Sequence, residues 1–196
     1  MIPKYFLPWE DKNILSKILY EFLYKSNDFK FILLITNKID HKYLVHIKSC
    51  LKKINFENYH ILEISTSSGQ AETAKIGIDY LSSNPSLAKN PVVFHNIDTL
   101  LHGRDFSKIN DDLVMYDGHI DVFKSANPEY SYVLLNNDNF VEEIVEKIIV
   151  SDYATSGLYG FKDYTIFLDY YENHHKYISE IYSAMILKGK KINRRK

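Results

Sequence analysis

The stretch that decides the fold is Phe31-Ile32-Leu33-Leu34-Ile35-Thr36, an unbroken apolar run of strand length. A run without polar alternation is typical of a strand that is covered on both faces. It is followed by helical spacing at 43–54, a strand pattern at 59–64, helical spacing at 69–81 and a short buried strand at 91–95. This alternation predicts an α/β protein with a mixed, mainly parallel sheet, right-handed crossovers and flanking helices.

A helix is also predicted before this run. Asp11 can cap its N-terminus, and the helix is expected to end near Ser26 and Asn27. Apolar residues recur along it at three-to-four spacing, which gives one buried face: Ile14, Leu15, Ile18, Leu19, Phe22 and Leu23.

Beyond about residue 115 the pattern changes to short strands separated by turns, which predicts a β-rich part with antiparallel pairs. The expected strands are 118–124, 130–135, 140–145 and 156–161. Two further helices are expected at 164–172 and 179–187, before a basic tail at 188–196 that we expect to be frayed.

Length favours one domain of residues 1–196, with a first half at 1–115 and a second half at 116–196. A chain of 196 residues can bury a core as one unit. Its 24 Lys and Arg residues against 25 Asp and Glu give a net charge of −1, which is too weak a field to indicate a nucleic-acid or membrane partner. The sequence leaves the oligomeric state open, a homo-oligomer included.

The single cysteine and the absence of a targeting pattern favour a cytoplasmic protein. Cys50 lies in helical spacing, excludes an internal disulfide and suits a reducing compartment. It has no evident activating partner, so we interpret it as a half-buried helical thiol. No apolar run approaches the length of about 20 residues that spans a bilayer, and the N-terminus has no cleavable signal pattern.

Two polar motifs stand at positions where α/β proteins bind ligands. His95-Asn96-Ile97-Asp98 follows the strand at 91–95, so Asp98 either holds Mg²⁺ at the sheet edge or caps the turn. Gly69-Gln70-Ala71-Glu72-Thr73 opens a helix, and its N–H groups with the Gln70 amide suit a phosphate or a base edge. Helix capping alone also explains this second motif.

A lysine stands between two prolines in Pro3-Lys4-Tyr5-Phe6-Leu7-Pro8, a segment that we expect to be extended. Lys4 is either a point charge that binds phosphate or a solvated terminal lysine.

The run Val141-Glu142-Glu143-Ile144-Val145-Glu146-Lys147 is an alternating strand that ends in an acid and a base. An open α/β sheet commonly places ligands just beyond its strand ends, where Glu146 and Lys147 would stand. A polar loop follows, and Gly157 opens the next strand. A sugar or a phosphate can sit there.

Other chemistries have no support in the sequence. The eight histidines do not form a zinc cluster, since His174 and His175 are adjacent and His41 and His46 are five apart. The chain has no G-x-S-x-G, no Walker lysine loop and no G-x-G-x-x-G, the patterns of hydrolase, P-loop and dinucleotide sites.

Taken in order, the motifs resemble the nucleotidyltransferases that activate sugar phosphates and related small phosphates. The matching segments are P-K-Y-F-L-P at 3–8, G-Q-A-E-T at 69–73, H-N-I-D at 95–98 and V-E-E-I-V-E-K with S-x-x-A-x-x-G-L-Y up to residue 159. Residues 127–132 and 177–179 add a likeness to the branch found in bacterial capsule and surface-polysaccharide gene clusters. The resemblance spans nearly the whole chain and implies a Rossmann-like nucleotide-diphospho-sugar transferase fold.

The resemblance also implies a reaction and site residues. A phosphate or phosphonate oxygen of the acceptor would attack the α-phosphate of a nucleoside triphosphate such as CTP and release pyrophosphate. Lys4 would contact the α-phosphate, and Asp98 would bind Mg²⁺, the implied cofactor. The nucleobase would lie against Gly69, Gln70 and Ala71, and the acceptor would bind at Glu146, Lys147 and Gly157. The first half, 1–115, would thus bind the nucleotide, and the second half, 116–196, would bind the acceptor.

The sequence departs from the family at both ends. The family begins with a strand and a G-x-G-x-R loop that cradles the triphosphate, whereas here only Ile2 and Pro3 stand between Met1 and Lys4. The family also continues with a further strand beyond the K-G-K-K-I type of segment, and its second metal carboxylate is not evident, with Asp152 and Glu180 the nearest candidates. Two alternatives therefore stay open: an active nucleotidyltransferase, or a truncated, inactive relative that binds a nucleotide or a nucleotide-sugar or pairs with another subunit.

Overall fold

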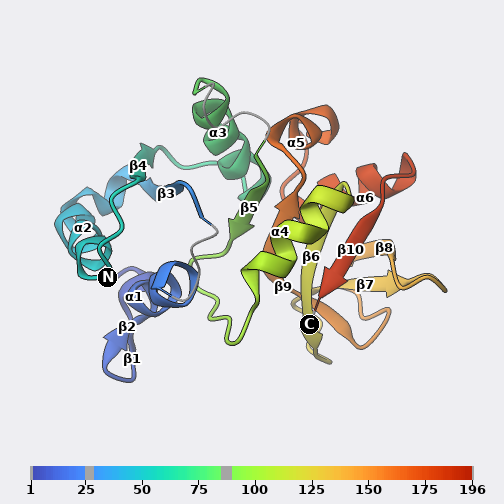
Figure 1. Ribbon diagram of the computed structural model, residues 1–196, viewed down its shortest axis with the longest axis horizontal. Coiled ribbons are helices and arrows are strands. Elements are labelled where there is room, and N and C mark those ends of the chain that lie inside the picture. The colour runs from blue at the N-terminus through green and yellow to red at the C-terminus, as the bar shows by residue number, and fades with distance from the viewer. Residues whose placement is uncertain (1, 25–28, 85–89, 196) are drawn as a thin grey trace. The chain divides into compact units, whose positions relative to one another are not determined.

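The computed structural model describes residues 2–24, 29–84 and 90–195, which form an α/β protein (Figure 1). The chain folds into two compact units. The first consists of Met1–Ser67 and Asn96–Ser107, and the second of Ser68–His95 and Lys108–Lys196. In this described part of the chain, no helix has both the length and the apolar character needed to cross a membrane.

The first unit contains a two-stranded parallel sheet of β3 (Ile32–Asn37) and β4 (Tyr59–Ile64), as the sequence predicts. Its other elements are η1 (Lys4–Phe6), β1 (Pro8–Trp9), β2 (Lys12–Asn13), α1 (Ile14–Leu19), η2 (Tyr20–Tyr24), η3 (Lys38–Tyr43) and α2 (Leu44–Lys53). In β3 only Thr36 is buried, and it is 9% exposed. The cover on both faces that the apolar run predicts is therefore incomplete among the described residues.

Helix α1 starts later than predicted. Asn13, not Asp11, is its N-cap, and the Asn13 Oδ1 accepts a hydrogen bond from the Ser16 backbone N–H at 2.8 Å. The reason is the β1–β2 hairpin, which precedes the helix and places Asp11 in its turn. The predicted helix end near Ser26 and Asn27 lies outside the described residues.

Cys50 lies on α2, as predicted, and is more buried than the sequence suggested. The Ser16 hydroxyl of α1 donates to its Sγ at 3.2 Å. The thiol thus packs as a small core side chain between two helices.

The second unit contains a six-stranded mixed sheet with the order β10-β6-β9-β7-β8, in which β5 also pairs with β9. The strands are β5 (Val92–His95), β6 (Gly118–Lys124), β7 (Ser131–Leu135), β8 (Val141–Glu146), β9 (Tyr153–Phe161) and β10 (Ile192–Arg195). The helices are α3 (Gln70–Ser82), α5 (Tyr164–Tyr170), α6 (Ile178–Leu187) and α4 (Phe106–Met115), whose first two residues belong to the first unit. β10 runs parallel to β6, whereas β5, β6 and β7 pair antiparallel with β9, and β7 with β8.

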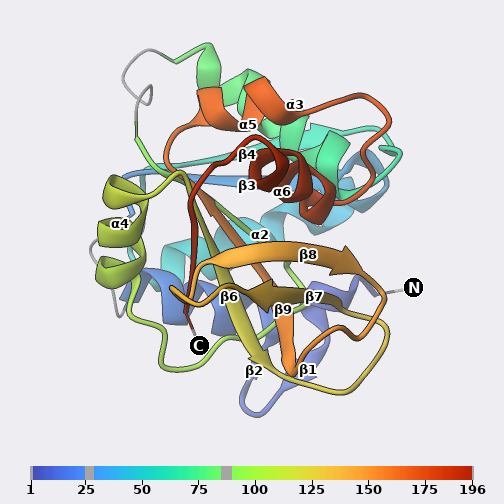
Figure 2. The same cartoon turned by 90° about the vertical axis from the view of Figure 1, so that its right-hand side faces the viewer.

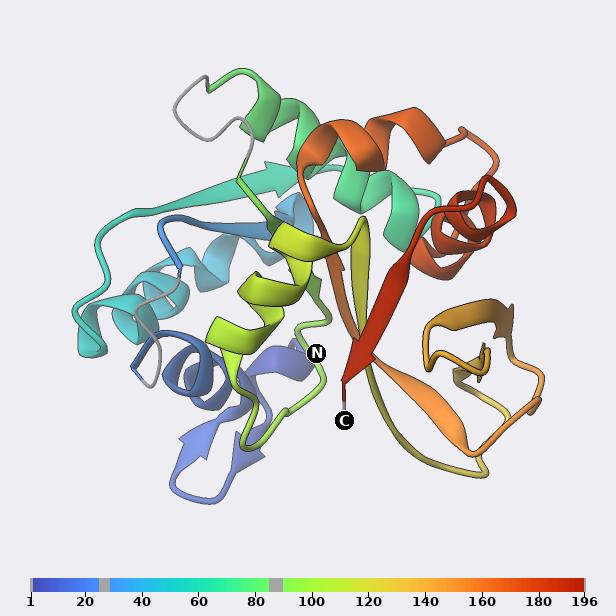
Figure 3. The same ribbon diagram turned by 45° about the vertical axis from the view of Figure 1, so that its right-hand side comes forward.

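One core joins the helices to a face of this sheet. Ile120 and Phe161 of the strands and Ala74, Phe167 and Tyr182 of α3, α5 and α6 are buried in one cluster. Figures 2 and 3 show α3, α5 and α6 grouped together, with β10 running beside β6. α4 was not predicted, although its buried residues Phe106, Ile109 and Leu113 stand at helical spacing.

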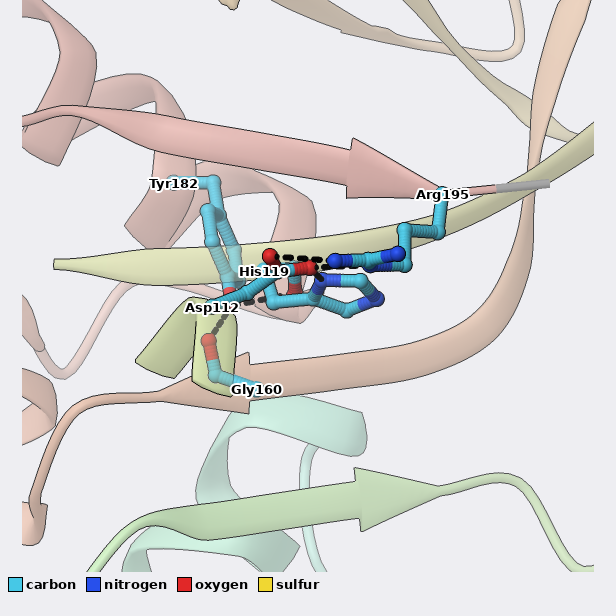
Figure 4. A network of polar contacts seen from close by, with 5 residues as sticks. All are labelled: Asp112, His119, Gly160, Tyr182 and Arg195. Carbon is cyan, nitrogen blue, oxygen red and sulfur yellow. Dashed lines mark hydrogen bonds and ion pairs between the residues drawn. The ribbon is translucent and has the colours of Figure 1, made fainter. Parts of the chain in front are cut away.

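The basic tail, expected to be frayed, instead forms β10 and pairs with β6 from Ile192 to Arg195. Its last described residue, Arg195, makes a bidentate ion pair with Asp112 of α4, Nε to Oδ2 at 2.5 Å and Nη2 to Oδ1 at 2.8 Å (Figure 4). The buried His119 ring of β6 lies on the same carboxylate, with Nδ1 3.1 Å from Oδ2. These contacts, with the strand pairing, explain why residues 192–195 are ordered.

The network fixes the charge of Asp112. Burial acts to raise the pKa of this carboxyl, but the hydrogen bonds from Arg195 and His119 outweigh it and hold the pKa well below its usual range. The other ring nitrogen of His119, Nε2, is buried and has no hydrogen-bond partner in the described part of the chain.

Arg195→Ala is expected to lower the free energy of unfolding by about 2–3 kcal/mol, because it leaves the Asp112 carboxylate buried without its main partner. The matched control is Arg194→Ala, whose guanidinium lies over the Tyr153 ring at 5.1 Å and whose loss should cost about 0.5–1 kcal/mol. Urea unfolding followed by circular dichroism measures both changes.

The effect of Arg195→Ala should also depend on pH. Because the folded-state pKa of Asp112 lies below its unfolded value, its contribution is present above about pH 4 and is lost as the pH falls further. The cost of the substitution should therefore shrink in acid. An equal cost at about pH 7 and about pH 2 would contradict this account of Asp112.

The two compact units group the residues differently from the halves 1–115 and 116–196. α3 and β5 belong to the second unit, because β5 pairs with β9 and α3 packs in the same core. A single domain of residues 1–196 stays a prediction.

Candidate functional site

Lys4 and Asp98 meet in the first unit, although 94 positions separate them in the sequence. The Lys4 Nζ lies 3.4 Å from the Asp98 Oδ2, and the side chains are 77% and 42% exposed. The segment around Lys4 is a single 3₁₀ turn, η1, rather than extended as predicted; Leu7 before the second proline is extended, with φ −58° and ψ 141°. An exposed ion pair of this kind contributes little to stability, so both charges can turn toward a ligand.

In the second unit, Gly69, Gln70 and Ala71 lie against the chain that leads into α6. The Ala71 backbone N–H donates to the Lys176 carbonyl at 3.0 Å, and the Ile178 N–H donates to the Gln70 Oε1 at 3.1 Å. A Cβ on Gly69 would lie 2.5 Å from the Lys176 carbonyl oxygen. Gly69 is extended, with φ 172°, so this close approach rather than its backbone angles requires glycine.

Glu146 ends β8, as predicted, and its carboxylate is held by two serines. The Ser179 hydroxyl donates to its Oε2 at 3.0 Å, and the Ser131 hydroxyl donates to the same oxygen. Ser131 stands directly opposite Glu146 on β7, and Ser179 lies in the first turn of α6. The carboxylate therefore lies beside the N-terminus of α6, where negative charge is favourable.

Lys147 follows in a left-handed backbone conformation, with φ +57°. Such a conformation is uncommon for a residue with a side chain and clusters at functional sites. Its Nζ donates to the Tyr177 hydroxyl at 3.1 Å and lies 5.0 Å from the centre of that ring. The hydrogen bond to Tyr177 raises the pKa of Lys147, so its ammonium stays charged at neutral pH.

The 176–179 segment, which consists of Lys176, Tyr177, Ile178 and Ser179, thus contacts both groups of predicted residues. One side meets Gly69, Gln70 and Ala71, and the other meets Glu146 and Lys147. In the sequence, residues 177–179 and Ser131 are part of the family resemblance only, and neither was predicted to have a role in the site. The sequence signal that comes nearest to finding Ser131 is the turn at 136–139, because a hairpin there pairs the strand of Ser131 with the strand that ends at Glu146.

Gly157 lies within β9 rather than at its start, and its φ of +86° favours glycine. No hydrogen bond joins it to Glu146 or Lys147 among the described residues. Next to it, the Thr155 and Tyr159 hydroxyls lie 3.0 Å apart, and burial raises the pKa of Tyr159 to about 12. Thr155 and Tyr159 are both buried, and each places an uncharged hydroxyl group in this part of the sheet.

A second metal carboxylate is not supported at Glu180. Its Oε2 accepts hydrogen bonds from the backbone N–H groups of Lys176 and Tyr177, at 2.6 and 2.8 Å, so it acts as a helix cap. Across the described ranges, no group of three or more His, Cys, Asp or Glu side chains could hold a metal ion.

Comparison with solved structures identifies the fold. The chain is similar to a nucleoside-diphosphate-sugar pyrophosphorylase from Vibrio cholerae, with a TM-score of 0.80 and 23% identity over 99% of this chain and 83% of the other. It is similar to a UDP-glucose pyrophosphorylase solved with UDP-glucose, with a TM-score of 0.73 and 15% identity over 100% and 83%. The chain has the nucleotide-diphospho-sugar transferase fold.

A third similar structure is the inositol-1-phosphate CTP transferase from T. maritima, with a TM-score of 0.70 and 14% identity over 98% of this chain and 76% of that one. No protein-family model matches the sequence. No curated protein matches it either. At these identities the likeness establishes the Rossmann-like fold predicted from the motifs, and the site roles stay predictions.

Gly69→Ala should lower the free energy of unfolding by about 1–3 kcal/mol, because the new methyl group would overlap the Lys176 carbonyl and force the backbones apart. Ser65→Ala, a change at an exposed side chain in the segment before α3, should cost less than about 0.5 kcal/mol. Thermal and urea unfolding of both variants measure the difference. Equal stability of the two variants would show that the close contact at Gly69 does not exist.

Proposed function

We propose that the chain is a nucleotidyltransferase that moves a nucleoside monophosphate from a nucleoside triphosphate to a sugar phosphate or another small phosphate or phosphonate. The observation that carries the proposal is the fold likeness over nearly the whole chain, together with four motifs in the family's order. The Lys4–Asp98 pair adds support, since a cation and a carboxylate from distant motifs lie together.

The proposed reaction needs little covalent help from the protein. An acceptor phosphate oxygen forms a bond to the α-phosphorus, the bond from that phosphorus to the β-bridging oxygen breaks, and pyrophosphate leaves with the electron pair. Lys4 would neutralise charge on the α-phosphate, and residues 69–71 would hold the nucleobase. Glu146, Lys147 and Gly157 would position the acceptor, so that orientation and charge neutralisation supply the rate.

Asp98 fits the implied Mg²⁺ as a single carboxylate ligand. Mg²⁺ is commonly held by one or two carboxylates with water and substrate phosphate oxygens, so a cage of three protein ligands is not required. The Asp98 side chain is 42% exposed and can exchange the Lys4 ammonium for a metal ion. When bound, Mg²⁺ would withdraw charge from the phosphate oxygens.

CTP is the nucleotide we propose first, and surface-polysaccharide synthesis is the proposed context. The support is the likeness of residues 127–132 and 177–179 to the capsule branch, together with the fold likeness to the inositol-1-phosphate CTP transferase. A cytoplasmic location is part of the same proposal.

A second candidate function is a non-catalytic relative that binds a nucleotide or nucleotide-sugar or pairs with another subunit. What favours it is that a fold likeness at 14–23% identity supports ligand binding of this kind without requiring turnover. Such a protein would bind ligands without turning them over.

Pyrophosphate release, measured with Mg²⁺, each of four nucleoside triphosphates and a panel of sugar and polyol phosphates, tests the proposal. We expect release with one preferred pair, and Asp98→Asn should lower kcat/KM at least about 100-fold if it holds the metal. The control is Asp111→Asn, the same change at an exposed residue of α4, which should stay within about twofold.

Two outcomes would count against the enzyme. Nucleotide binding by the folded protein without release from any pair would support the non-catalytic relative. Full activity of Asp98→Asn would remove Asp98 from the proposed machinery.

A further inference from the structure

Glu146 and Lys147 are each held by a side chain of the 176–179 segment. Ser179 donates to the Glu146 Oε2 at 3.0 Å, and Tyr177 accepts from the Lys147 Nζ at 3.1 Å. We propose that Tyr177 and Ser179 are positioning residues that orient this acid and base toward one acceptor. The proposal rests on the proposed function, and it names residues to which neither the motifs nor the fold likeness gives a role.

Lys147 needs such support because its side chain is long, exposed and attached to a left-handed backbone position. A free lysine of this kind samples many rotamers, and fixing it on a ligand costs conformational entropy. The Tyr177 hydroxyl takes one N–H of the ammonium, and the ring lies beneath it at 5.0 Å. The other two N–H groups have no hydrogen-bond partner among the described residues, and they can donate to phosphate oxygens.

Glu146 is prepared in a complementary way. Ser131 and Ser179 both donate to Oε2, whereas Oε1 has no hydrogen-bond partner in the described part of the chain. A half-buried carboxylate with one oxygen occupied presents the other oxygen to a donor. The pair thus recognises a molecule with a hydroxyl donor on one side and anionic phosphate oxygens on the other, which is the chemistry of a hydroxylated phosphate.

The backbone that carries the two positioning side chains is itself fixed. The Glu180 carboxylate accepts from the backbone N–H groups of Lys176 and Tyr177, and Gln70 accepts from that of Ile178. Ser179 is only 2% exposed. Because one rigid segment carries both contacts, the relative placement of Glu146 and Lys147 is set before any ligand arrives.

The kinetic test uses the full chain with its preferred substrate pair. Tyr177→Phe, which keeps the ring and removes the acceptor oxygen, should raise KM for the acceptor about three- to tenfold and leave kcat and the nucleotide KM within about twofold. Ser179→Ala should act in the same direction. The matched controls are Tyr171→Phe, whose ring stacks on Phe167, and Ser183→Ala, whose single hydroxyl proton is shared between the Ser179 and Ile144 carbonyl oxygens, each 3.2 Å away.

A second measurement needs no substrate, so it separates this proposal from the proposed function. In protein labelled with ¹³C-lysine, the Lys147 Cε resonance, assigned with Lys147→Arg, is followed through a pH titration. Tyr177→Phe should lower the pKa of Lys147 and shift its resonance, whereas Tyr171→Phe should change neither.

An unchanged Lys147 titration in Tyr177→Phe would overturn the positioning role, whatever the protein's activity. A rise in acceptor KM as large in Ser183→Ala as in Ser179→Ala would also overturn it, since the effect would then come from α6 in general. Absence of turnover with every pair, beside a shifted Lys147 titration, would instead reject the proposed function and leave the contact established.

Discussion

The contact between the start of α3 and the start of α6 is the constraint on which the rest of the candidate site in the second unit depends. It consists of two hydrogen bonds, from Ala71 to Lys176 and from Ile178 to Gln70, around a glycine with no room for a side chain. The first N–H groups of a helix have no acceptor within the helix. Here the Ala71 N–H of α3 donates to the chain that leads into α6, and the Ile178 N–H of α6 donates to the Gln70 side chain of α3. These two bonds join the motif at 69–73 to the segment at 176–179, although the two are far apart in the sequence.

This constraint changes how the G-Q-A-E-T motif is read. The sequence predicts that the Gln70 amide binds the edge of a nucleobase, yet its carbonyl oxygen accepts a hydrogen bond from the Ile178 backbone N–H of α6. The two roles are compatible, because a side chain held from one side by the protein is better ordered for a ligand on the other. The same holds for Glu146, whose serine-bound oxygen leaves Oε1 for recognition.

Much of the fold followed from sequence patterns, because period and turn signals are local. The apolar run at 31–36, the strands at 118–124 and 59–64 and the helix at 69–81 lie where predicted, within one or two residues. The β10 strand was missed because its charged residues have no strand periodicity, and it is ordered through β6 and Asp112. Such long-range pairing leaves no trace in the local sequence.

The candidate site was less predictable, for a reason visible in the β7–β8 hairpin. Counting back from the pair Leu135 and Val141 would place Ser131 opposite Val145, but a register shift between Leu134 and Leu135 places it opposite Glu146. A shift of one residue turns a side chain to the other face, so simple counting fails at the residue that matters. The Lys4–Asp98 pair shows the same limit. The motifs predicted that each residue belongs to the site, but they did not predict that the two side chains form an ion pair.

The most direct test of the central claim is amide hydrogen exchange at Ile178, measured by NMR. Ile178 is the first residue of α6, so its N–H has no acceptor within the helix, and its protection reports on Gln70. We predict slow exchange in the wild type and in Gln70→Glu, which keeps an oxygen acceptor, and fast exchange in Gln70→Leu. Fast exchange at Ile178 in the wild type, or protection that survives Gln70→Leu, would contradict the claim that this contact ties the predicted motifs together.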